Sequence, residues 1–339
     1  MTDSTTCVLA GDIGGTSTRL AVFHVCGQQL ETLAKASYPS QQYASLKDVI
    51  AIFQRTHQHT LQAACFGVAG PIHQQEAKIT NLPWQISATD IAESLTLPRV
   101  SLLNDLEATG WGLHTLKAED FHTLQHGADE ASGNAAILAA GTGLGEAGLY
   151  FDGQQYRPFA CEGGHTDFSP QTELDMALLR YLAREHEHVS WERVVSGNGL
   201  VSMHKCLCQL RQREIPDWLQ QAMREGDPAA AISMAAQEGR DAICVEALGM
   251  FVHLYGVEAG NLALKLMATG GLYIAGGIAP KILPQLQSGV FMTAFLAKGR
   301  MQHLLERIPV QVVLNDEAGL QGAAFFAGTC SRLQDAPTH

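Results

Sequence analysis

Short apolar runs that end in glycine-rich turns recur along the chain. Near the start, Cys7–Asp12 is apolar, residues 14–17 are Gly-Gly-Thr-Ser, and Leu20–Val25 is apolar again. This pattern predicts a strand, a tight turn and a second strand. The same order returns later in the chain, at Ala135–Ala140, Gly141–Gly145 and Ala147–Phe151. Because the two copies lie about 130 residues apart, they indicate an internal duplication.

Other apolar runs alternate with segments whose apolar residues recur at helical spacing. The expected strands are Ala63–Val68, Val100–Leu103, Leu272–Ala275 and Val310–Leu314. The expected helices are Val49–Thr56, Thr89–Leu95 with Thr89 as its cap, Gln171–Glu185, Ala242–Ala268 and Gly319–Ala327. Residues 196–199, Ser-Gly-Asn-Gly, are expected to break the helical pattern that begins at Glu192. The alternation of strands and helices places the chain in the α/β class.

Length and composition narrow this class further. The chain has 339 residues, which favours two domains because single hydrophobic cores stop growing near about 250–300 residues. Hydrophobic residues make up 46% and charged residues 17%, which argues against disorder. The net charge of −12, without a dense basic stretch, excludes a nucleic-acid backbone as partner. A phosphate ligand is still compatible, because backbone N–H groups and a metal ion can bind it.

The sequence also bears on location and redox state. No apolar run reaches the ~18 residues of a membrane span, and the first residues lack the basic region of a signal peptide, so we expect a cytoplasmic protein without membrane contact. Eight scattered cysteines indicate free thiols. Only Cys206 and Cys208 lie close together, and no second pair completes a ligand set, so the sequence predicts no requirement for zinc.

Three glycine-rich turns are candidate phosphate or nucleotide sites. In Asp12-Ile-Gly-Gly-Thr16, the carboxylate could hold a metal through water while bare backbone approaches phosphate oxygens. An ordinary hairpin turn is the alternative. Gly141–Gly145 repeats this arrangement, and it matches GxGxxG only formally because a strand, rather than a helix, is expected next. Gly276-Gly277 follows an expected strand, where bare backbone could approach a phosphate or a flat ring. The alternative is that these glycines only allow a helix to pack closely against the strand.

Polar residues that could take part in catalysis or bind a ligand lie at three further places. Asn104-Asp105 ends an expected strand, where a carboxylate can serve catalysis or simply cap the next helix. Glu162-Gly-Gly-His165 combines a carboxylate and an imidazole that could bind several hydroxyl groups. Glu192 could do the same or lie in solvent. P-loop, protein-kinase and nucleophile-elbow motifs are absent from the sequence.

Taken in order, these motifs resemble a known family. They are Asp12-Ile-Gly-Gly-Thr, Leu103-Asn-Asp, Ala140-Gly-Thr-Gly-Leu-Gly, Glu162-Gly-Gly-His-Thr-Asp-Phe, Glu192-Arg-Val-Val-Ser-Gly-Asn-Gly-Leu and Ile274-Ala-Gly-Gly-Ile-Ala-Pro. The chain resembles bacterial glucokinases of the hexokinase/actin-like superfamily over nearly its whole length. ROK sugar kinases carry a cysteine-rich zinc loop after a comparable histidine, whereas Thr-Asp-Phe-Ser-Pro follows His165 here.

The resemblance implies two ribonuclease-H-like α/β domains around a central cleft. The small domain would comprise residues 1–112 and 314–339, and the large domain residues 113–313. It also implies ATP-dependent phosphorylation of the glucose 6-hydroxyl, with Mg²⁺ as cofactor and a homodimer as the assembly.

The resemblance further implies roles for individual residues. Asp105 would be the catalytic base. The residues that would hold sugar hydroxyls are Asn104, Asp105, Glu162, His165 and Glu192. Asp12 would serve Mg²⁺ through water. The residues that would bind ATP are Gly11, Asp12, Gly14, Gly15, Thr16, Gly141, Thr142, Gly143, Gly276 and Gly277. Two alternatives stay open at this point: a kinase for another hexose such as mannose, fructose or an N-acetylated hexosamine, and a catalytically silent sugar sensor. Asp12 and Asp105, which a sensor could lose, are both present.

Overall fold

The computed structural model describes residues 5–79 and 82–330. The chain forms two compact units. Unit 1 contains the chain up to Ala118, the segment Tyr156–Ala160 and the chain from Asn315 onward, and unit 2 contains Glu119–Gln155 and Cys161–Leu314. The first unit is therefore discontinuous in sequence. The predicted boundaries, at 112/113 and 313/314, stay a prediction, and the segment Tyr156–Ala160 was not expected in the first unit.

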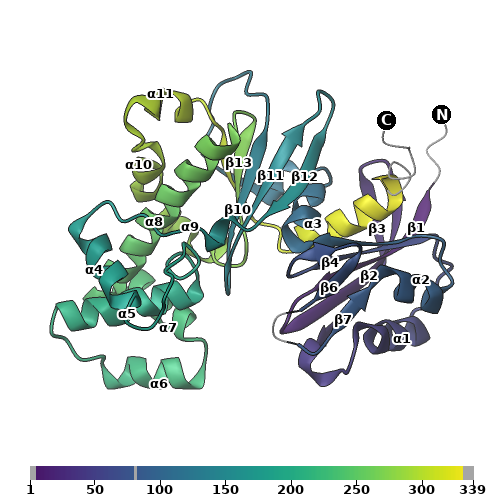
Figure 1. Ribbon diagram of the computed structural model, residues 1–339, viewed down its shortest axis with the longest axis horizontal. Coiled ribbons are helices and arrows are strands. Elements are labelled where there is room, and N and C mark those ends of the chain that lie inside the picture. The colour runs from purple at the N-terminus through teal and green to yellow at the C-terminus, as the bar shows by residue number, and fades with distance from the viewer. Residues whose placement is uncertain (1–4, 80–81, 331–339) are drawn as a thin grey trace. The chain divides into compact units, whose positions relative to one another are not determined.

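Unit 1 is built on a five-stranded sheet with the order β3-β2-β1-β4-β8 (Figure 1). Its strands are β1 Thr6–Ile13, β2 Ser17–Cys26, β3 Gln29–Pro39, β4 Ala63–Val68 and β8 Val100–Asn104. β1 pairs antiparallel with β2 and parallel with β4, which pairs parallel with β8. A second, three-stranded sheet contains β5 Ile72–His73, β6 Glu76–Lys78 and β7 Gln85–Ser87.

The large sheet of unit 1 is buried on both faces, because alternate residues of its central strand β1 enter different cores. Leu9 and Ile13 pack with α1 and α2, whereas Val8 and Ala10 pack with α3 and α12. Figure 1 shows these two helix pairs on opposite faces of the sheet. The helices are α1 Leu46–Thr56, α2 Ala88–Leu95, α3 Asp105–Gly112 and α12 Ala318–Phe325, and a π-helical segment, Phe326–Cys330, follows α12.

The caps of the helices in unit 1 explain where these helices begin. Ser45 accepts a hydrogen bond from the Asp48 backbone N–H, so α1 begins three residues before the predicted start. The cap of α2 is Ser87, whose side chain accepts from the Asp90 N–H. The prediction that Thr89 is this cap is wrong, because Thr89 lies inside the helix.

Unit 2 repeats the strand order of unit 1. Its sheet is six-stranded with the order β12-β11-β10-β13-β14-β9, and all of the edge strand β12 except Cys161 belongs to the segment grouped with unit 1. The strands are β9 Phe121–Gln125, β10 Ala135–Ala140, β11 Leu144–Phe151, β12 Tyr156–Cys161, β13 Gly271–Ala275 and β14 Val310–Val313. As in unit 1, the central strand pairs antiparallel with the next strand in sequence and parallel with a later one. The sheet of unit 2 has one strand more than that of unit 1: β9, which lies at the edge next to β14. The predicted repeat of strand, turn and strand is therefore present in both units, and the duplication itself stays a prediction.

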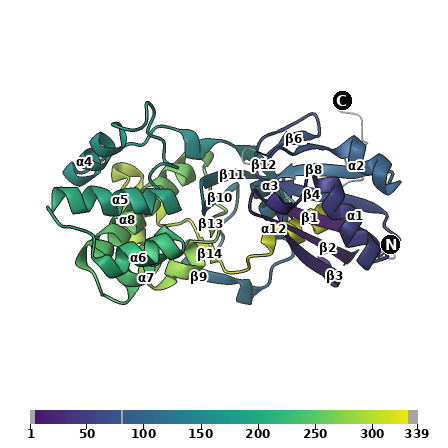
Figure 2. The same ribbon diagram turned by 90° about the horizontal axis from the view of Figure 1, so that it is seen from below.

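A layer of helices packs against one face of the sheet of unit 2, the face that carries Ala136, Leu138 and Ala140 of β10 (Figure 2). They are α4 Glu173–Leu182, α5 Gly197–Leu210, α6 Asp217–Glu225, α7 Pro228–Gln237, α8 Ala242–Leu266, α9 Leu283–Leu286, α10 Val290–Leu296 and α11 Gln302–Leu305. Helix α8 is long and apolar enough to cross a membrane by length and composition alone. However, two thirds of its apolar window is buried inside the unit, and residues such as Phe251, Leu254 and Tyr255 are fully buried. This burial identifies α8 as the core helix of unit 2.

The predicted helix break at residues 196–199 is wrong, because α5 begins at Gly197. Ser196 caps the helix by accepting from the Gly199 N–H at 3.1 Å. The glycines allow close packing here: a Cβ on Gly199 would lie 1.9 Å from the Val194 carbonyl oxygen. Glycine is therefore required by contact with the preceding turn and does not interrupt the helix.

Candidate active site

The first turn, between β1 and β2, carries an ion pair. Asp12 and Arg19 are cross-strand partners in the hairpin. The Arg19 side chain donates from Nη2 to Asp12 Oδ2 at 2.6 Å and from Nε to the same oxygen at 3.1 Å. It also donates to the Asp316 backbone carbonyl at 2.8 Å. The Asp12 carboxylate is therefore fixed beside the turn by an arginine that the sequence analysis missed, although the hairpin register could have identified it.

Backbone contacts close the same turn. The Gly14 N–H donates to the Ser17 carbonyl at 3.0 Å, and the Ser40 hydroxyl donates to the Gly14 carbonyl at 2.8 Å. Gly11 differs from the turn glycines because it lies inside β1, where a Cβ would meet Phe66 Cδ1 at 2.4 Å. This contact gives Gly11 a packing role, and its predicted contact with ATP stays a prediction.

Asn104 and Asp105 stand where β8 ends and α3 begins. The Asn104 Oδ1 atom accepts from the Leu106 N–H at 3.0 Å, while the Glu107 carboxylate accepts from the Asn104 N–H at 3.0 Å. The Asn104 side chain and the Glu107 backbone N–H also interact, which completes a capping box, so Asn104 is the helix cap and Asp105 is the first residue of α3. The alternative interpretation of Asp105 as the cap is therefore wrong. Asp105 Oδ1 also accepts from the Leu106 N–H, at 3.0 Å.

The register of the sheet brings these two places to one edge of unit 1. Ile13 is paired with Val68, and Val68 is paired with Asn104. Adjacent strands lie about 4.8 Å apart, so the Asp12 turn and Asn104 are separated by two strand spacings, about 10 Å. The carboxyl ends of the parallel strands in α/β sheets are the usual place for ligands. Unit 1 therefore holds a candidate site at this edge.

The corresponding edge of unit 2 is lined by glycine backbone. The Gly141 N–H donates to the Gly143 carbonyl at 2.8 Å and closes the turn between β10 and β11. The Ile278 N–H donates to the Ala140 carbonyl at 3.2 Å, which holds the Gly276-Gly277 segment beside this turn. Among the residues the structure describes, no atom lies within 4 Å of a Cβ added to Gly141 or Gly277. Both glycines thus present bare backbone to open space.

Glu192 joins two loops that are distant in sequence. Its Oε2 atom accepts from the Leu144 N–H at 3.1 Å, and its backbone N–H donates to the Gly164 carbonyl at 2.8 Å. A Cβ on Gly143 would lie 2.3 Å from Glu192 Oε2, and one on Gly164 would lie 2.1 Å from the Leu144 carbonyl oxygen. These two glycines are therefore needed for the loops to interlock around the glutamate.

Glu162 and His165 flank the second of these loops, the 3₁₀ turn Gly163–His165. Their side chains are 63% and 59% exposed, and His165 Nε2 lies 3.9 Å from Glu162 Oε2. The Thr166 N–H and hydroxyl both donate to the Gly163 carbonyl and fix the turn. The structure thus places Glu162, His165 and Glu192 around one loop of unit 2, with two of them accessible to a ligand.

A buried acid pair lies beneath this loop and was not expected from the sequence. Glu146 on β11 is 2% exposed and Glu258 on α8 is fully buried. Burial, with Glu258 nearby, raises the pKa of Glu146 to about 8, so Glu146 keeps its proton near neutral pH. Lys265 Nζ lies 3.2 Å from Glu258 Oε1. A Cβ on Gly163 would lie 1.9 Å from Glu146 Oε2, which places the pair directly under the Gly163–His165 turn.

Comparison with known proteins identifies the family of the chain. The family model "Glucokinase" matches residues 9–330. The chain belongs to the glucokinase family. It is 43% identical to the glucokinase of Nostoc punctiforme over 337 residues, covering 95% of this chain and 99% of the relative. It is 35% identical to the glucokinase of Yersinia pestis, covering 95% and 96%.

Solved structures of sugar kinases share the fold. A glucokinase from an Antarctic psychrotroph superposes with a TM-score of 0.82 at 32% identity, covering 95% of this chain and 98% of that one. A ROK-family glucokinase from Streptomyces griseus, solved with glucose and AMPPNP, has a TM-score of 0.64 at 21% identity, covering 95% and 99%. The predicted α/β fold of two hexokinase-type domains is therefore confirmed as a fold class.

Proposed function

We propose that this glucokinase-family protein transfers the γ-phosphoryl group of ATP to the 6-hydroxyl of glucose, giving glucose 6-phosphate and ADP. Family membership supports the reaction class. The observation that carries the assignment within the chain is the capping box at α3. Because Asn104 caps this helix, capping does not account for a carboxylate at position 105. Asp105 stands at the carboxyl edge of the sheet, where a general base would be required.

In this proposal Asp105 accepts the proton of the attacking hydroxyl as the new bond to phosphorus forms. Phosphoryl transfer needs little other covalent work from a protein, because positioning and charge stabilisation supply most of the catalysis. Asn104, Glu162, His165 and Glu192 would bind the remaining hydroxyls. The exposure of Glu162 and His165 supports such contacts, since glucose carries no charge and depends on several fixed donors and acceptors.

The glycine turns would bind ATP. Gly141 and Gly277 support this role because their backbone faces open space, where phosphate oxygens or a flat base can approach. Gly276 has φ +83°, and a Cβ there would lie 2.5 Å from the Ala140 carbonyl, so glycine is required at this position. The remaining proposed contacts with ATP are Gly11, Gly14, Gly15, Thr16, Thr142 and Gly143.

Asp12 would hold Mg²⁺ through a water molecule. The residues present fit such an ion, because both bonds from Arg19 fall on Asp12 Oδ2 and a metal-bound water could donate to Oδ1. When bound, the ion would neutralise charge on the transferred phosphates. We further propose that the protein is cytoplasmic and acts as a homodimer.

The test is a coupled ADP-release assay with a panel of hexoses. We expect turnover with ATP and glucose that requires both substrates. Faster turnover with mannose, fructose or an N-acetylated hexosamine would identify a kinase for another hexose. Glucose binding without ADP release from any hexose would instead support a sugar sensor. Size-exclusion chromatography with light scattering tests the dimer.

A further inference from the structure

Two helices of unit 2 bring four metal-ligand side chains together, away from the glycine turns. On α5, His204 and Cys208 are four residues apart and share one helix face. On the other helix, Asp241 caps α8 and Cys244 lies in its first turn. Ligand atoms of His204, Asp241 and Cys244 all lie within 4.8 Å of one another. The sulfur of Cys208 lies 3.9 Å from His204 Nε2.

The burial of these groups sets this cluster apart from a polar surface patch. His204 is fully buried and Cys244 is fully buried, and Cys208 is 8% exposed. Within the described part of the chain, His204 Nδ1 has no hydrogen-bond partner. A buried ring nitrogen without a partner is uncommon in folded proteins and needs an explanation. A metal ion bound in the cluster supplies one.

The chemistry of these groups suits a divalent cation. A metal ion binds neutral imidazole and thiolate ligands, and it deprotonates a coordinating thiol outright. The Asp241 carboxylate would then face a cation rather than a buried thiol.

We propose that His204, Cys208, Asp241 and Cys244 form a structural zinc site that joins α5 to the start of α8. Two sulfurs, one imidazole nitrogen and one carboxylate oxygen suit tetrahedral zinc better than magnesium or calcium. Bond lengths of about 2.0–2.3 Å place tetrahedral ligands roughly 3.3–3.8 Å apart, so the ligand atoms of His204, Asp241 and Cys244 need to contract by about 1 Å. Cys208 lies outside that group of three and has to move farther to become the fourth ligand. This proposal departs from the prediction of no zinc requirement, which considered only ligands that are near one another in sequence and not those that α8 contributes.

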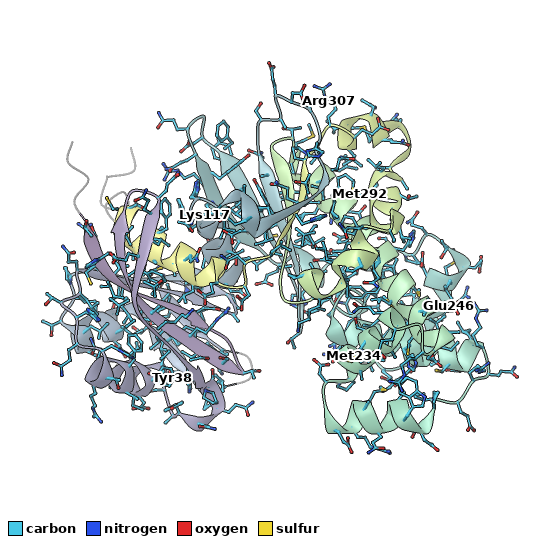
Figure 3. All side chains as sticks on the ribbon, turned by 180° about the vertical axis from the view of Figure 1, so that it is seen from behind. Tyr38, Lys117, Met234, Glu246, Met292 and Arg307 are labelled. Atoms are coloured by element: carbon cyan, nitrogen blue, oxygen red, sulfur yellow. The ribbon has the colours of Figure 1, made fainter. Side chains whose placement is uncertain are left out.

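The surroundings of the cluster support a structural role. On the outer side of the same two helices, Arg211 Nη2 on α5 lies 2.6 Å from Glu246 Oε1 on α8, and Glu246 is labelled in Figure 3. An exposed ion pair of this kind contributes little stability. A buried zinc ion would hold the same helices from the inside. Loss of the zinc ion would loosen the packing of α5 against α8 without changing any residue of the glycine turns.

The experiment uses the full-length protein, purified without an affinity tag and loaded with ZnCl₂. We expect elemental analysis to find about one zinc per chain after gel filtration. Cobalt substitution should give the thiolate-to-cobalt absorption band, and a chelator should lower the melting temperature by at least about 2 °C. Because zinc content and the cobalt spectrum are measured without turnover, the result is independent of the proposed kinase activity.

Cys244→Ser and His204→Asn should each lower zinc content at least tenfold and abolish the cobalt band. Cys206→Ser is the matched control: Cys206 is equally buried on α5 but lies outside the ligand set, so this variant should keep full zinc content. If Cys244→Ser fails to fold, the cobalt spectra of wild type and Cys208→Ser still decide the question. A wild-type protein that takes up neither zinc nor cobalt overturns the proposal. Equal metal content in the wild type and the folded Cys244→Ser variant does the same.

Discussion

Replacement of Asp105 by asparagine separates a catalytic carboxylate from a structural one. Asparagine has nearly the same shape and keeps an oxygen that can accept from the Leu106 N–H, as Asp105 Oδ1 does at 3.0 Å. It cannot take a proton from an attacking hydroxyl. The helix cap is untouched, because Asn104 and Glu107 form the capping box. The substitution therefore removes one charge at the first position of α3 and keeps the hydrogen bond from the Leu106 N–H.

Two magnitudes follow from this geometry. A negative charge in the first turn of a helix stabilises it by about 0.3–1 kcal/mol, so the melting temperature should fall by no more than about 4 °C. Loss of a general base lowers the rate by about 10²–10⁴, which raises the barrier by roughly 2.7–5.4 kcal/mol. We expect turnover to fall at least about 100-fold while the dissociation constant of glucose changes only a few-fold.

The assay combines a melting curve, a glucose titration and steady-state ADP release. Asp217→Asn is the matched control, because Asp217 is also the first residue of a helix, α6, and lies in unit 2 outside the proposed site. This control should lose a similar, small amount of stability and no turnover. Near-normal turnover of well-folded Asp105→Asn would refute the assignment of the base. An equal loss of turnover in the control would show that helix stability, rather than proton transfer, limits the reaction.

Three further results are expected. Excess EDTA should abolish turnover until millimolar magnesium is restored, and full activity in EDTA would contradict the requirement for magnesium. Asp12→Asn should raise the magnesium concentration for half-maximal rate by about 10–100-fold. Gly143→Ala puts a methyl group 2.3 Å from Glu192 Oε2 and should weaken glucose binding about tenfold in calorimetry, whereas Gly249→Ala, with open space around its Cβ, should not. The raised pKa of Glu146, about 8 against about 4.3 unfolded, means that the folded protein keeps a proton and loses stability as pH rises from about 5 through 8. Melting temperatures should therefore fall more steeply from pH 6 to 9 for wild type than for Glu146→Gln. If the two curves of melting temperature against pH were parallel, Glu146 would not hold a proton in the folded protein.

The apolar strands and their turns could be predicted because local pattern decides them. In both units a buried apolar run leads into glycine, and the predicted hairpins are present at Thr6–Cys26 and Ala135–Phe151. Strand β3 was not predicted, since most of its residues are exposed or half-buried and its apolar signal is weak. Its pairing along the length of β2 makes it a strand, and this pairing is a tertiary effect.

The site residues also divide into those that local sequence reveals and those that only the folded structure brings together. Asn104-Asp105 and Glu162-Gly-Gly-His165 could be found because each motif is contiguous in sequence. The bond of Glu192 to the Leu144 N–H, and the position of Glu146 beneath Gly163, depend on loops that fold together from distant segments. A glutamate inside an apolar strand gave one signal for Glu146, because a buried carboxylate requires a partner. Its partner on α8 could not be identified without the fold.

The duplicated hairpins show how one fold element has acquired two chemistries. In the first, Asp12 faces Arg19 across the strands, and this pair brings charge to the turn. In the second, the residues at the equivalent register are Ala139 and Gly145, which carry no charge. The first turn could therefore orient a hydrated cation, whereas the strands of the second bring no ion pair to their turn, which offers backbone N–H groups and the Thr142 hydroxyl. Two turns at equivalent places in the two sheets are thus not interchangeable, and the proposed division between metal binding at Asp12 and phosphate contact at Gly141 rests on this difference in side chains.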